Sequence, residues 1–363
     1  MIKNLYHIIL KEFFMKKFYK QRKCVETKIY FIFIILLISI NFTQAQELPV
    51  HEQYIFDYTL VNPSFAGLTQ STMIKLSHRQ QWFGFKNPPN TSFLLARHRF
   101  KETNLGVGGY IYQDQNGPNS NYGIQASASY HLLLKSNRNK KHILSFGLSL
   151  KAKIHVLDES KFEHDIYDPI ITYGKNLSYL FNSNAGILYS TTKFFLGYSA
   201  DNLLPFVDNL YKSNTEPRFN FIHNVHIGKV WEFKNNHQIR VSAIYKTDLK
   251  IHSLMQQLDA SLRYYYQFGQ QARSKHVRYK DMLWGGINYK QTLDLGNFSP
   301  LSISPVLGYT KNIYSVAISY DYPMSPISKY SFGSVQVMLS VKFAHTDWRF
   351  WEDFKVPNFY YDF

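Results

Sequence analysis

Residues 334–343 read Ser-Val-Gln-Val-Met-Leu-Ser-Val-Lys-Phe, and this stretch decides the fold. Successive side chains of a strand point to opposite faces, so the valines, Leu339 and Phe343 share one face. The other face is polar except for Met338. Such alternation, closing on an aromatic, is typical of outer-membrane β-barrel strands, whose apolar face meets lipid and whose polar face lines the lumen. A soluble β-sandwich strand can show the same pattern, so repetition along the chain must decide.

The alternation recurs throughout the chain after Gly67, and turn residues separate the segments. In residues 144–155, for example, Leu, Phe, Ala and Ile alternate with Ser, Gly, Lys and His. We expect fourteen strands. They cover residues 72–79, 91–100, 104–113, 120–134, 142–155, 182–190, 193–200, 220–231, 237–247, 256–267, 279–290, 299–310, 312–321 and 333–343.

The expected connections alternate in length. Those after even-numbered strands are short, and those after odd-numbered strands are longer, up to the stretch 156–181. Short periplasmic turns and longer outer loops characterise outer-membrane barrels, whereas a sandwich gives no reason for this asymmetry. An even strand count also puts both termini in the periplasm. We therefore predict an all-β fold: a transmembrane antiparallel β-barrel of about 14 strands, in the outer membrane of a Gram-negative bacterium. Aromatics make up 17% of the residues, as interfacial girdles require.

The N-terminus indicates export. Residues 1–28 are rich in Lys and Arg, residues 29–40 are almost purely apolar, and Ala45 offers a small residue for cleavage. We read residues 1–45 as a signal peptide, with Met15 as an alternative start. The other reading, a membrane anchor helix, needs about twenty apolar residues.

Cleavage after Ala45 would remove Cys24, the single cysteine, and with it disulfides and thiolate chemistry. It would also remove eight of the 41 basic and two of the 25 acidic residues, which leaves 33 against 23, a net charge of +10. The charges are dispersed and match no nucleic-acid-binding motif, so nucleic acid is not an expected partner. They suit lumen and loop positions, lipopolysaccharide and outer-membrane lipid, or an acidic partner.

Two segments flank the barrel, which we place at residues 71–343. Residues 46–70 alternate poorly and form either a periplasmic arm or a plug inside the lumen. Residues 344–363 form a short aromatic C-terminal tail with acids between the rings. The tail either packs on the barrel rim or docks a partner.

Two motifs carry a resemblance to a known family. The first is Glu-Gln-Tyr-Ile-Phe-Asp at 52–57 with Asn-Pro-Ser-Phe-Ala-Gly at 62–67, and the second is Arg-Gln-Gln-Trp-Phe-Gly-Phe at 79–85. They resemble the N-terminal signature of the PorP/SprF family, outer-membrane proteins associated with type IX secretion in Bacteroidota. Less specific matches continue through 105–117, 201–203 and 320–322 to nearly the end of the chain. One departure is Ser-Val-Gln at 334–336, where the family often has Ser-His-Glu.

The resemblance implies partners rather than chemistry. They are other components of the type IX secretion and gliding apparatus, a large secreted adhesin or surface protein, and a periplasmic peptidoglycan-binding lipoprotein. The chain would support export or surface anchoring of the secreted partner; whether as a core component or as a dedicated anchor stays open. The motif residues are the partner-binding candidates: Gln53, Tyr54, Asn62, Pro63, Ala66, Gly67, Arg79, Gln80, Trp82, Gly84 and Phe85.

We expect Arg79, Gln80 and Trp82 to start the first outer loop. There the guanidinium fork and the indole N–H either bind carbonyls and carboxylates of a partner or only pack the loop over the lumen.

Basic residues recur on the expected inward faces, and they favour an alternative function. The candidates are Lys151, Lys153, Arg240, Arg263 and Lys342. A basic lumen selects anions, which would suit a channel for anionic or amphipathic solutes. Alternatively these residues pair with Asp259, Asp321 and the acids of the 46–70 segment, and that segment fills a barrel otherwise wide enough to conduct.

An enzyme is not expected. Ser129 and His131 share an inward face, but nothing in the sequence matches a nucleophile motif around them. We expect no catalytic site, no cofactor and no metal.

Overall fold

The computed structural model describes residues 54, 56–69, 71–85, 87–100, 103–137, 140–162, 174–204, 206–207, 221–233, 236–248, 256–274, 277–294 and 297–344. All of them belong to one compact unit of the chain. The expected signal peptide, Gln53 and the tail beyond residue 344 lie outside the described residues. Among the described residues, no helix is long and apolar enough to cross a membrane.

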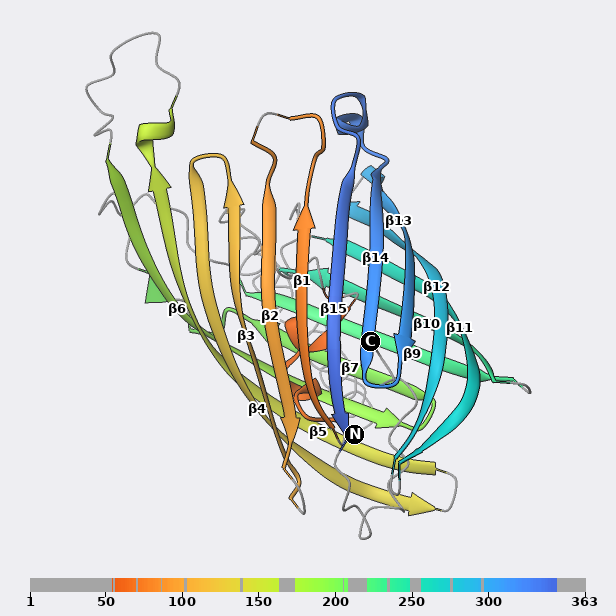
Figure 1. Ribbon diagram of the computed structural model, residues 1–363. Coiled ribbons are helices and arrows are strands. Elements are labelled where there is room, and N and C mark those ends of the chain that lie inside the picture. The colour runs from red at the N-terminus through yellow and green to blue at the C-terminus, as the bar shows by residue number, and fades with distance from the viewer. Residues whose placement is uncertain are drawn as a thin grey trace, which may run out of the picture. The chain divides into compact units, whose positions relative to one another are not determined.

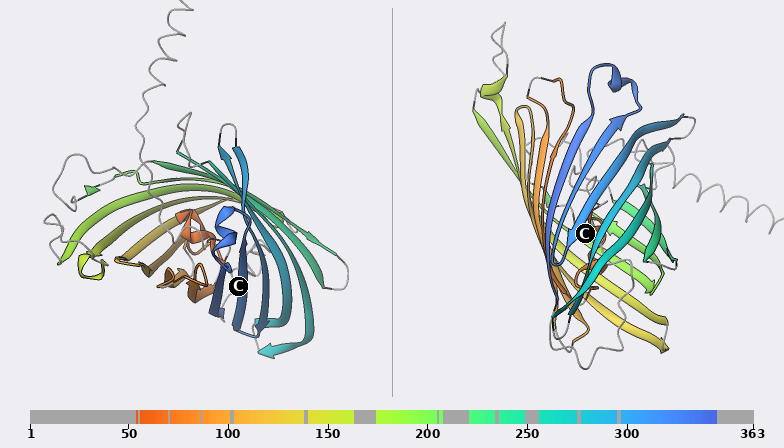
Figure 2. Two further views of the ribbon diagram at one scale, coloured as in Figure 1. Left: turned by 90° about the horizontal axis from the view of Figure 1, so that it is seen from above. Right: turned by 45° about the vertical axis from the view of Figure 1, so that its right-hand side comes forward.

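Fourteen long antiparallel strands of the described chain form a closed barrel, as predicted (Figures 1 and 2). Each long strand pairs with the next along the chain, and β1 pairs with β15 over ten residue pairs to close the ring. A two-residue strand, β8, adds to β6. The strands are β1 (Ser71–Gln80), β2 (Asn90–Arg99), β3 (Leu105–Asn116), β4 (Asn119–Asn137), β5 (Lys140–Asp158), β6 (Lys175–Thr191), β7 (Phe194–Asp201), β8 (Phe206–Val207), β9 (Ile222–Glu232), β10 (His237–Thr247), β11 (Gln257–Ser274), β12 (Val277–Asp294), β13 (Asn297–Lys311), β14 (Tyr314–Pro323) and β15 (Ser334–Ala344).

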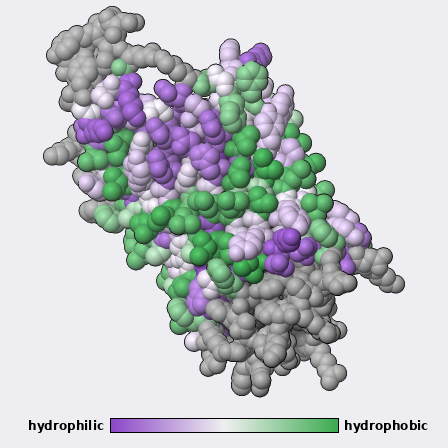
Figure 3. All heavy atoms as spheres, viewed as in Figure 1, coloured by the Kyte–Doolittle hydropathy of each residue, from purple (hydrophilic) through white to green (hydrophobic). Residues whose placement is uncertain are grey.

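The apolar faces of the strands point outward. In β15, Leu339 is 50% exposed, whereas Gln336, Met338 and Ser340 face the lumen and are at most 4% exposed. Figure 3 shows hydrophobic residues gathered in a band across the strands on one face of the molecule. An outer surface made of Leu, Ile, Val and aromatic side chains is suited to contact with lipid, because exposing an apolar patch of this size to water is unfavourable. The polarity of the strands therefore excludes the soluble sandwich.

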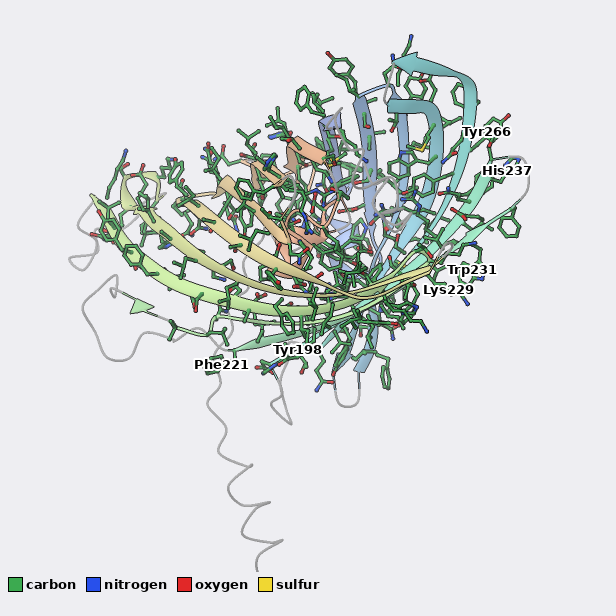
Figure 4. All side chains as sticks on the ribbon, turned by 90° about the horizontal axis from the view of Figure 1, so that it is seen from below. Tyr198, Phe221, Lys229, Trp231, His237 and Tyr266 are labelled. Carbon is green, nitrogen blue, oxygen red and sulfur yellow. The ribbon has the colours of Figure 1, made fainter. Side chains whose placement is uncertain are left out.

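Aromatic side chains also lie on the outer wall where the strands end. Trp231 and His237 lie there on β9 and β10, and Tyr266 of β11 pairs with His237 beside them (Figure 4). The rings of His237 and Tyr266 stack at 4.9 Å between centroids, and Lys229 Nζ lies 5.0 Å from the centroid of the Trp231 ring. Rings with a polar edge prefer the boundary between acyl chains and water, so this group fits the expected interfacial girdle.

The two ends of the barrel differ, although less than the sequence predicts. At one end, the turn end, the six connections span at most five residues each, and β1 begins and β15 ends there. At the other, the loop end, five connections span nine residues or more, including 81–89 and 324–333. Two loop-end connections were expected to be longer but have only two residues, because β3 pairs with β4 up to Asn116 and β12 pairs with β13 up to Asp294.

Residues 54 and 56–69, which we call the plug segment, lie inside the barrel (Figure 2, left). The segment makes two short 3-10 helices, η2 (Tyr58–Leu60) and η3 (Pro63–Phe65). Its apolar side chains pack on the few inward apolar positions of the wall. Tyr54, Phe56, Val61, Ile244, Tyr265, Trp284, Val306, Ala317 and Met338 form one such cluster. Met338, which breaks the alternation of β15, is therefore a contact of the plug segment.

A charged side chain on the outer wall should cost stability. We expect Leu148→Arg, at a position 68% exposed in the middle of β5, to lower the free energy of unfolding by about 2–4 kcal/mol, since the arginine must enter lipid. The measurement is urea unfolding of the barrel in lipid vesicles. The control, Ser328→Arg in the exposed η5 (Pro326–Lys329), should change it by less than about 1 kcal/mol. Equal effects at both positions would contradict a lipid-facing wall.

Candidate functional site

The plug segment owes its local shape to side-chain caps. The Asp57 carboxylate accepts from the Thr59 backbone N–H (2.9 Å), and the Asn62 side-chain carbonyl accepts from that of Ser64 (2.9 Å). Pro63 occupies the first position of η3, where its fixed φ suits a helical turn. Gly67 then leaves the turn with φ +60°, a conformation that favours glycine. The chain bend expected at Asn62-Pro63 and Gly67 is therefore present.

Asp57 ties the plug segment to β1 and β2. Lys75 Nζ lies 2.7 Å from Asp57 Oδ2, and Arg97 Nη1 lies 3.3 Å from Asp57 Oδ1. Lys75 also donates to the Phe56 carbonyl (2.7 Å). All three charged side chains are buried. Burial alone would raise the pKa of Asp57, but the charges of Arg97 and Lys75, together with hydrogen bonds to the carboxylate, hold this pKa well below its ordinary value.

Asn62 connects the plug segment to β6, β7 and β9. Its Nδ2 donates to the carbonyls of Ile187 (3.4 Å) and Tyr198 (3.3 Å) and lies 2.7 Å from His226 Nε2. Because an amide nitrogen can only donate, His226 Nε2 accepts and a neutral ring carries its proton on Nδ1. A Cβ on Gly186 would lie 2.0 Å from Asn62 Oδ1, so glycine makes the room for this contact.

The Ala66 carbonyl is the third attachment. It accepts hydrogen bonds from Ser129 Oγ and from His131 Nε2, the latter at 3.0 Å. His131 Nδ1 then accepts from Ser145 Oγ (2.7 Å). Ser129 and His131, adjacent on an inward face as the alternation predicts, therefore bind the backbone of the plug segment. A Cβ on Gly106 would lie 2.4 Å from the Ala66 carbonyl oxygen, so the two chains touch through backbone.

The second motif lies elsewhere, at the loop end of the closing seam. Arg79 lies in β1, within the expected strand 72–79, and its guanidinium does not reach into the first outer loop but pairs in the lumen with Asp321 of β14 at 2.7 Å. The pair is buried and reaches across β15, which lies between β1 and β14. Gln80 is the last residue of β1 and pairs with Val335 of β15.

Trp82, Gly84 and Phe85 follow in the β1–β2 loop. Phe83 N donates to the Gly333 carbonyl (3.0 Å) and Phe332 N donates to the Phe83 carbonyl (2.9 Å), so this loop and the β14–β15 loop are joined through backbone. Trp82 and Gly84 adopt positive φ (52° and 104°). Phe85 is 43% exposed. The two family motifs thus form two sites: Tyr54 and 62–67 in the lumen, and 79–85 at the seam.

The lumenal basic candidates do not gather in one place. Lys151 is buried on β5 with Lys153 two residues on, whereas Arg240 and Arg263 face each other on β10 and β11. Arg240 lies over the ring of Tyr265 (3.8 Å to the centroid), and Arg263 near that of Trp284 (5.5 Å). Lys342 is near the turn end of β15 and partly buried.

The inward acids pair with basic residues, and Lys246, which the alternation also places on an inward face, is one of them. Asp57 binds Lys75 and Arg97, Asp321 binds Arg79, and Asp259 lies 4.0 Å from Lys246. Sequence reasoning missed Lys75 and Arg97, although both occupy inward positions of predicted strands. In the described part of the chain, no three His, Cys, Asp or Glu side chains are grouped to hold a metal.

The sequence matches one family model, described as "Type IX secretion system membrane protein PorP/SprF", over residues 43–341. No curated protein matches the chain. Solved structures with a similar fold include the CymD monoaromatic hydrocarbon channel (12% identity, 80% of this chain and 93% of that chain, TM-score 0.45). Another is the Ralstonia pickettii toluene transporter TbuX (9% identity, 79% and 92%, TM-score 0.45).

Loss of the Asp57 charge should release the plug segment. Asp57→Asn keeps the cap on Thr59 but leaves Lys75 and Arg97 without a counter-charge, a change that costs about 3–5 kcal/mol in buried pairs. The reporter is thiol labelling of Thr59→Cys, a buried position, in a chain with Cys24→Ser. We expect Asp57→Asn to raise the labelling rate at least tenfold. Asp281→Asn, which changes an acid that caps the β13–β14 turn, is the control. Equal rates would contradict anchoring by Asp57.

Asn62 and Gly186 should be energetically coupled. Gly186→Ala pushes a methyl group into the Asn62 side chain and should cost about 1–3 kcal/mol. Asn62→Ala should cost a similar amount through lost hydrogen bonds. In the double variant the methyl group meets no amide. The loss in free energy of unfolding should therefore be smaller than the sum of the two single-variant losses by at least about 0.5 kcal/mol. Denaturant unfolding gives the free energy of unfolding of the wild type, the two single variants and the double variant. Gly285→Ala is a control with a more distant neighbour, Leu307 at 3.1 Å. Strict additivity would contradict the contact.

Proposed function

We propose a function from the family to which this chain belongs: it is a member of the PorP/SprF family of type IX secretion system membrane proteins. In this proposal the chain is a non-enzymatic outer-membrane barrel of the type IX secretion and gliding apparatus. It supports the export or surface anchoring of a secreted partner protein.

The observation that carries the proposal is the filled lumen. A fourteen-stranded barrel is wide enough to conduct unless something occupies it. Here a motif-bearing segment lies inside and is held by buried contacts to β1, β2, β4, β6, β7 and β9. Such anchoring supports a barrel that acts as a rigid holder more than an open pore.

The seam at the loop end is the proposed contact surface for the secreted partner. Its two loops are braced by backbone hydrogen bonds, so exposed Phe85, with Trp82 beside it at 6.1 Å between ring centroids, is presented in a fixed geometry. Pre-ordered aromatic residues are typical anchors of protein interfaces, since little entropy is lost when they bind.

We assign the turn end, where β1 begins and β15 ends, to the periplasm, following the usual orientation of outer-membrane barrels, and we propose that both chain termini lie on that side. A large secreted adhesin or surface protein would then meet the loop end. Other secretion components and a peptidoglycan-binding lipoprotein would meet the turn end, and lipopolysaccharide would surround the outer part of the wall.

The second candidate function is a channel for anionic or amphipathic solutes. The inward lysines of β5 favour it, because they give one part of the lumen a positive field. Current through the purified barrel in planar bilayers distinguishes the two: a holder stays closed, and a channel conducts with anion selectivity.

The test is co-purification from native outer membranes with the full-length chain tagged at a periplasmic position. We expect one dominant large surface protein or a peptidoglycan-binding lipoprotein. Phe85→Ala with Trp82→Ala should lower recovery of a surface partner at least tenfold, through loss of the aromatic contacts. Phe298→Ala, which removes another exposed ring near the loop end, is the matched control and should leave recovery unchanged. A lone barrel that conducts would contradict the proposal.

A further inference from the structure

Lys229 places a positive charge on the apolar outer wall of the barrel (Figure 4). The alternation of β9 puts it on the outward face between Ile227 and Trp231, which are 45% and 39% exposed. Its cross-strand neighbours are Phe194 on β7 and Val241 on β10. None of these four side chains can accept a hydrogen bond from the ammonium. A lysine on a lipid-facing wall is unfavourable unless its charge reaches the membrane interface or an anion.

The described part of the chain does not neutralise this charge. Within it, the ammonium of Lys229 has neither a carboxylate nor a hydrogen-bond partner, and Nζ lies 5.0 Å from the centroid of the Trp231 ring. Glu232 is the nearest acid along β9, and it pairs with Lys193 of the β6–β7 turn at 3.2 Å. The compensating negative charge therefore has to come from a group other than the described residues.

The side chain of Lys229 runs toward the turn end. Because β9 leads from the loop end to the turn end, Trp231 is one outward position closer to the turn end than Lys229. Two residues of a strand span roughly 7 Å, and the position of Nζ beside the Trp231 ring shows that the lysine stem bridges this distance. Long basic side chains in membranes keep the stem among acyl chains and the charge at the level of the headgroups.

The wall around Trp231 is held in place by stacked rings. Trp231 pairs across the sheet with Ile239 of β10, which in turn pairs with Tyr264 of β11. His237 stacks with Tyr264 at 5.8 Å and with Tyr266 at 4.9 Å between centroids. The Tyr264 hydroxyl lies 2.5 Å from His237 Nδ1, and Nε2 of that ring has no partner in the described ranges. An ordered surface of this kind loses little entropy when a ligand binds.

We propose that Lys229 binds the phosphate of a glycerophospholipid whose headgroup carries a net negative charge. The phosphate oxygens accept a charge-assisted hydrogen bond from the ammonium at the level of Trp231. The rest of the headgroup lies against His237 at the turn end. The acyl chains extend in the opposite direction, along Ile227 and Val241 of the apolar wall.

The pairing of Glu232 with Lys193 favours an anionic headgroup over a zwitterionic one. A zwitterionic headgroup brings its own ammonium, which competes for the phosphate and has no free acid of the wall to bind, because Glu232 is already paired. An anionic headgroup brings no such cation, so Lys229 serves as its counter-charge.

The choice of a glycerophospholipid over lipopolysaccharide follows from the assignment of the turn end to the periplasm. The inference therefore rests on the proposed orientation of the barrel. It does not rest on the secretion role, which co-purification tests separately, so either can fail without the other.

The experiment is native mass spectrometry of the full-length chain released from detergent micelles, with dissociation constants taken from the lipid-bound fractions. Three probes are added one at a time: phosphatidylglycerol, phosphatidylethanolamine with the same acyl chains, and lipopolysaccharide. The variants are Lys229→Met, which removes the charge, and Lys229→Arg, which keeps it. The matched control is Lys311→Met, which changes an exposed lysine at the turn end of β13, beside a turn that Asp281 caps.

We expect the wild type to bind phosphatidylglycerol at least tenfold more tightly than phosphatidylethanolamine, and Lys229→Met to bind phosphatidylglycerol at least tenfold more weakly than the wild type. Lys229→Arg and Lys311→Met should stay within threefold of the wild type. Without added lipid, Lys229→Met should melt no lower than the wild type, because it puts an apolar side chain on an apolar wall, and this shows that the variant folds.

Equal phosphatidylglycerol affinities of the wild type and Lys229→Met would mean non-specific lipid contact and would overturn the proposal. Tighter binding of lipopolysaccharide than of phosphatidylglycerol, lost in Lys229→Met, would also overturn it, since the turn end would then face the outer leaflet.

Discussion

The pairing of β1 with β15 is the constraint on which the rest of the structure depends. In a bilayer no water is available for an open sheet edge, and each unpaired backbone group would cost several kcal/mol. The first and last strands must therefore meet, and they do so over the full length of β1. The seam is reinforced twice more at the loop end, by the buried Arg79–Asp321 pair, which joins β1 to β14 across β15, and by the backbone hydrogen bonds of Phe83 with the β14–β15 loop.

A closed sheet with its apolar face in lipid has a polar interior. The polar groups there need hydrogen-bond partners, and the lumen is wide enough to hold a further segment of chain. The plug segment supplies such partners and occupies the lumen. Its backbone carbonyls accept from Lys75, Ser129 and His131, and its few apolar side chains cover the inward aromatic positions of β11 and β12. Because the contacts involve six strands far apart in sequence, the segment also braces the barrel across its lumen. The glycines at 106, 147 and 186 let the segment approach the wall this closely.

The charges inside the lumen are distributed unevenly along the barrel. Near the plug segment, Asp57 is shared by two cations, so that region is held by strong, buried attraction. Further toward the loop end, Lys151 is buried between the amides of Gln125 and Asn182, and the buried carboxylate of Asp201 attracts it.

The sequence by itself determined the barrel, its fourteen strands and the direction of each face. Alternation is a local property, visible in ten residues such as 334–343, and its polarity follows from lipid outside and a polar lumen inside. It also marked Asn62-Pro63 and Gly67 as a bend, because these residues restrict their own backbone. Only the tertiary structure decided that residues 54 and 56–69 lie inside the barrel. It also decided that Asp57 pairs with Lys75 and Arg97 among many inward cations, and that the Arg79 side chain faces the lumen. These outcomes depend on contacts between residues far apart in the chain, 40 positions for Asp57 and Arg97 and 242 for Arg79 and Asp321, and no local pattern encodes such contacts.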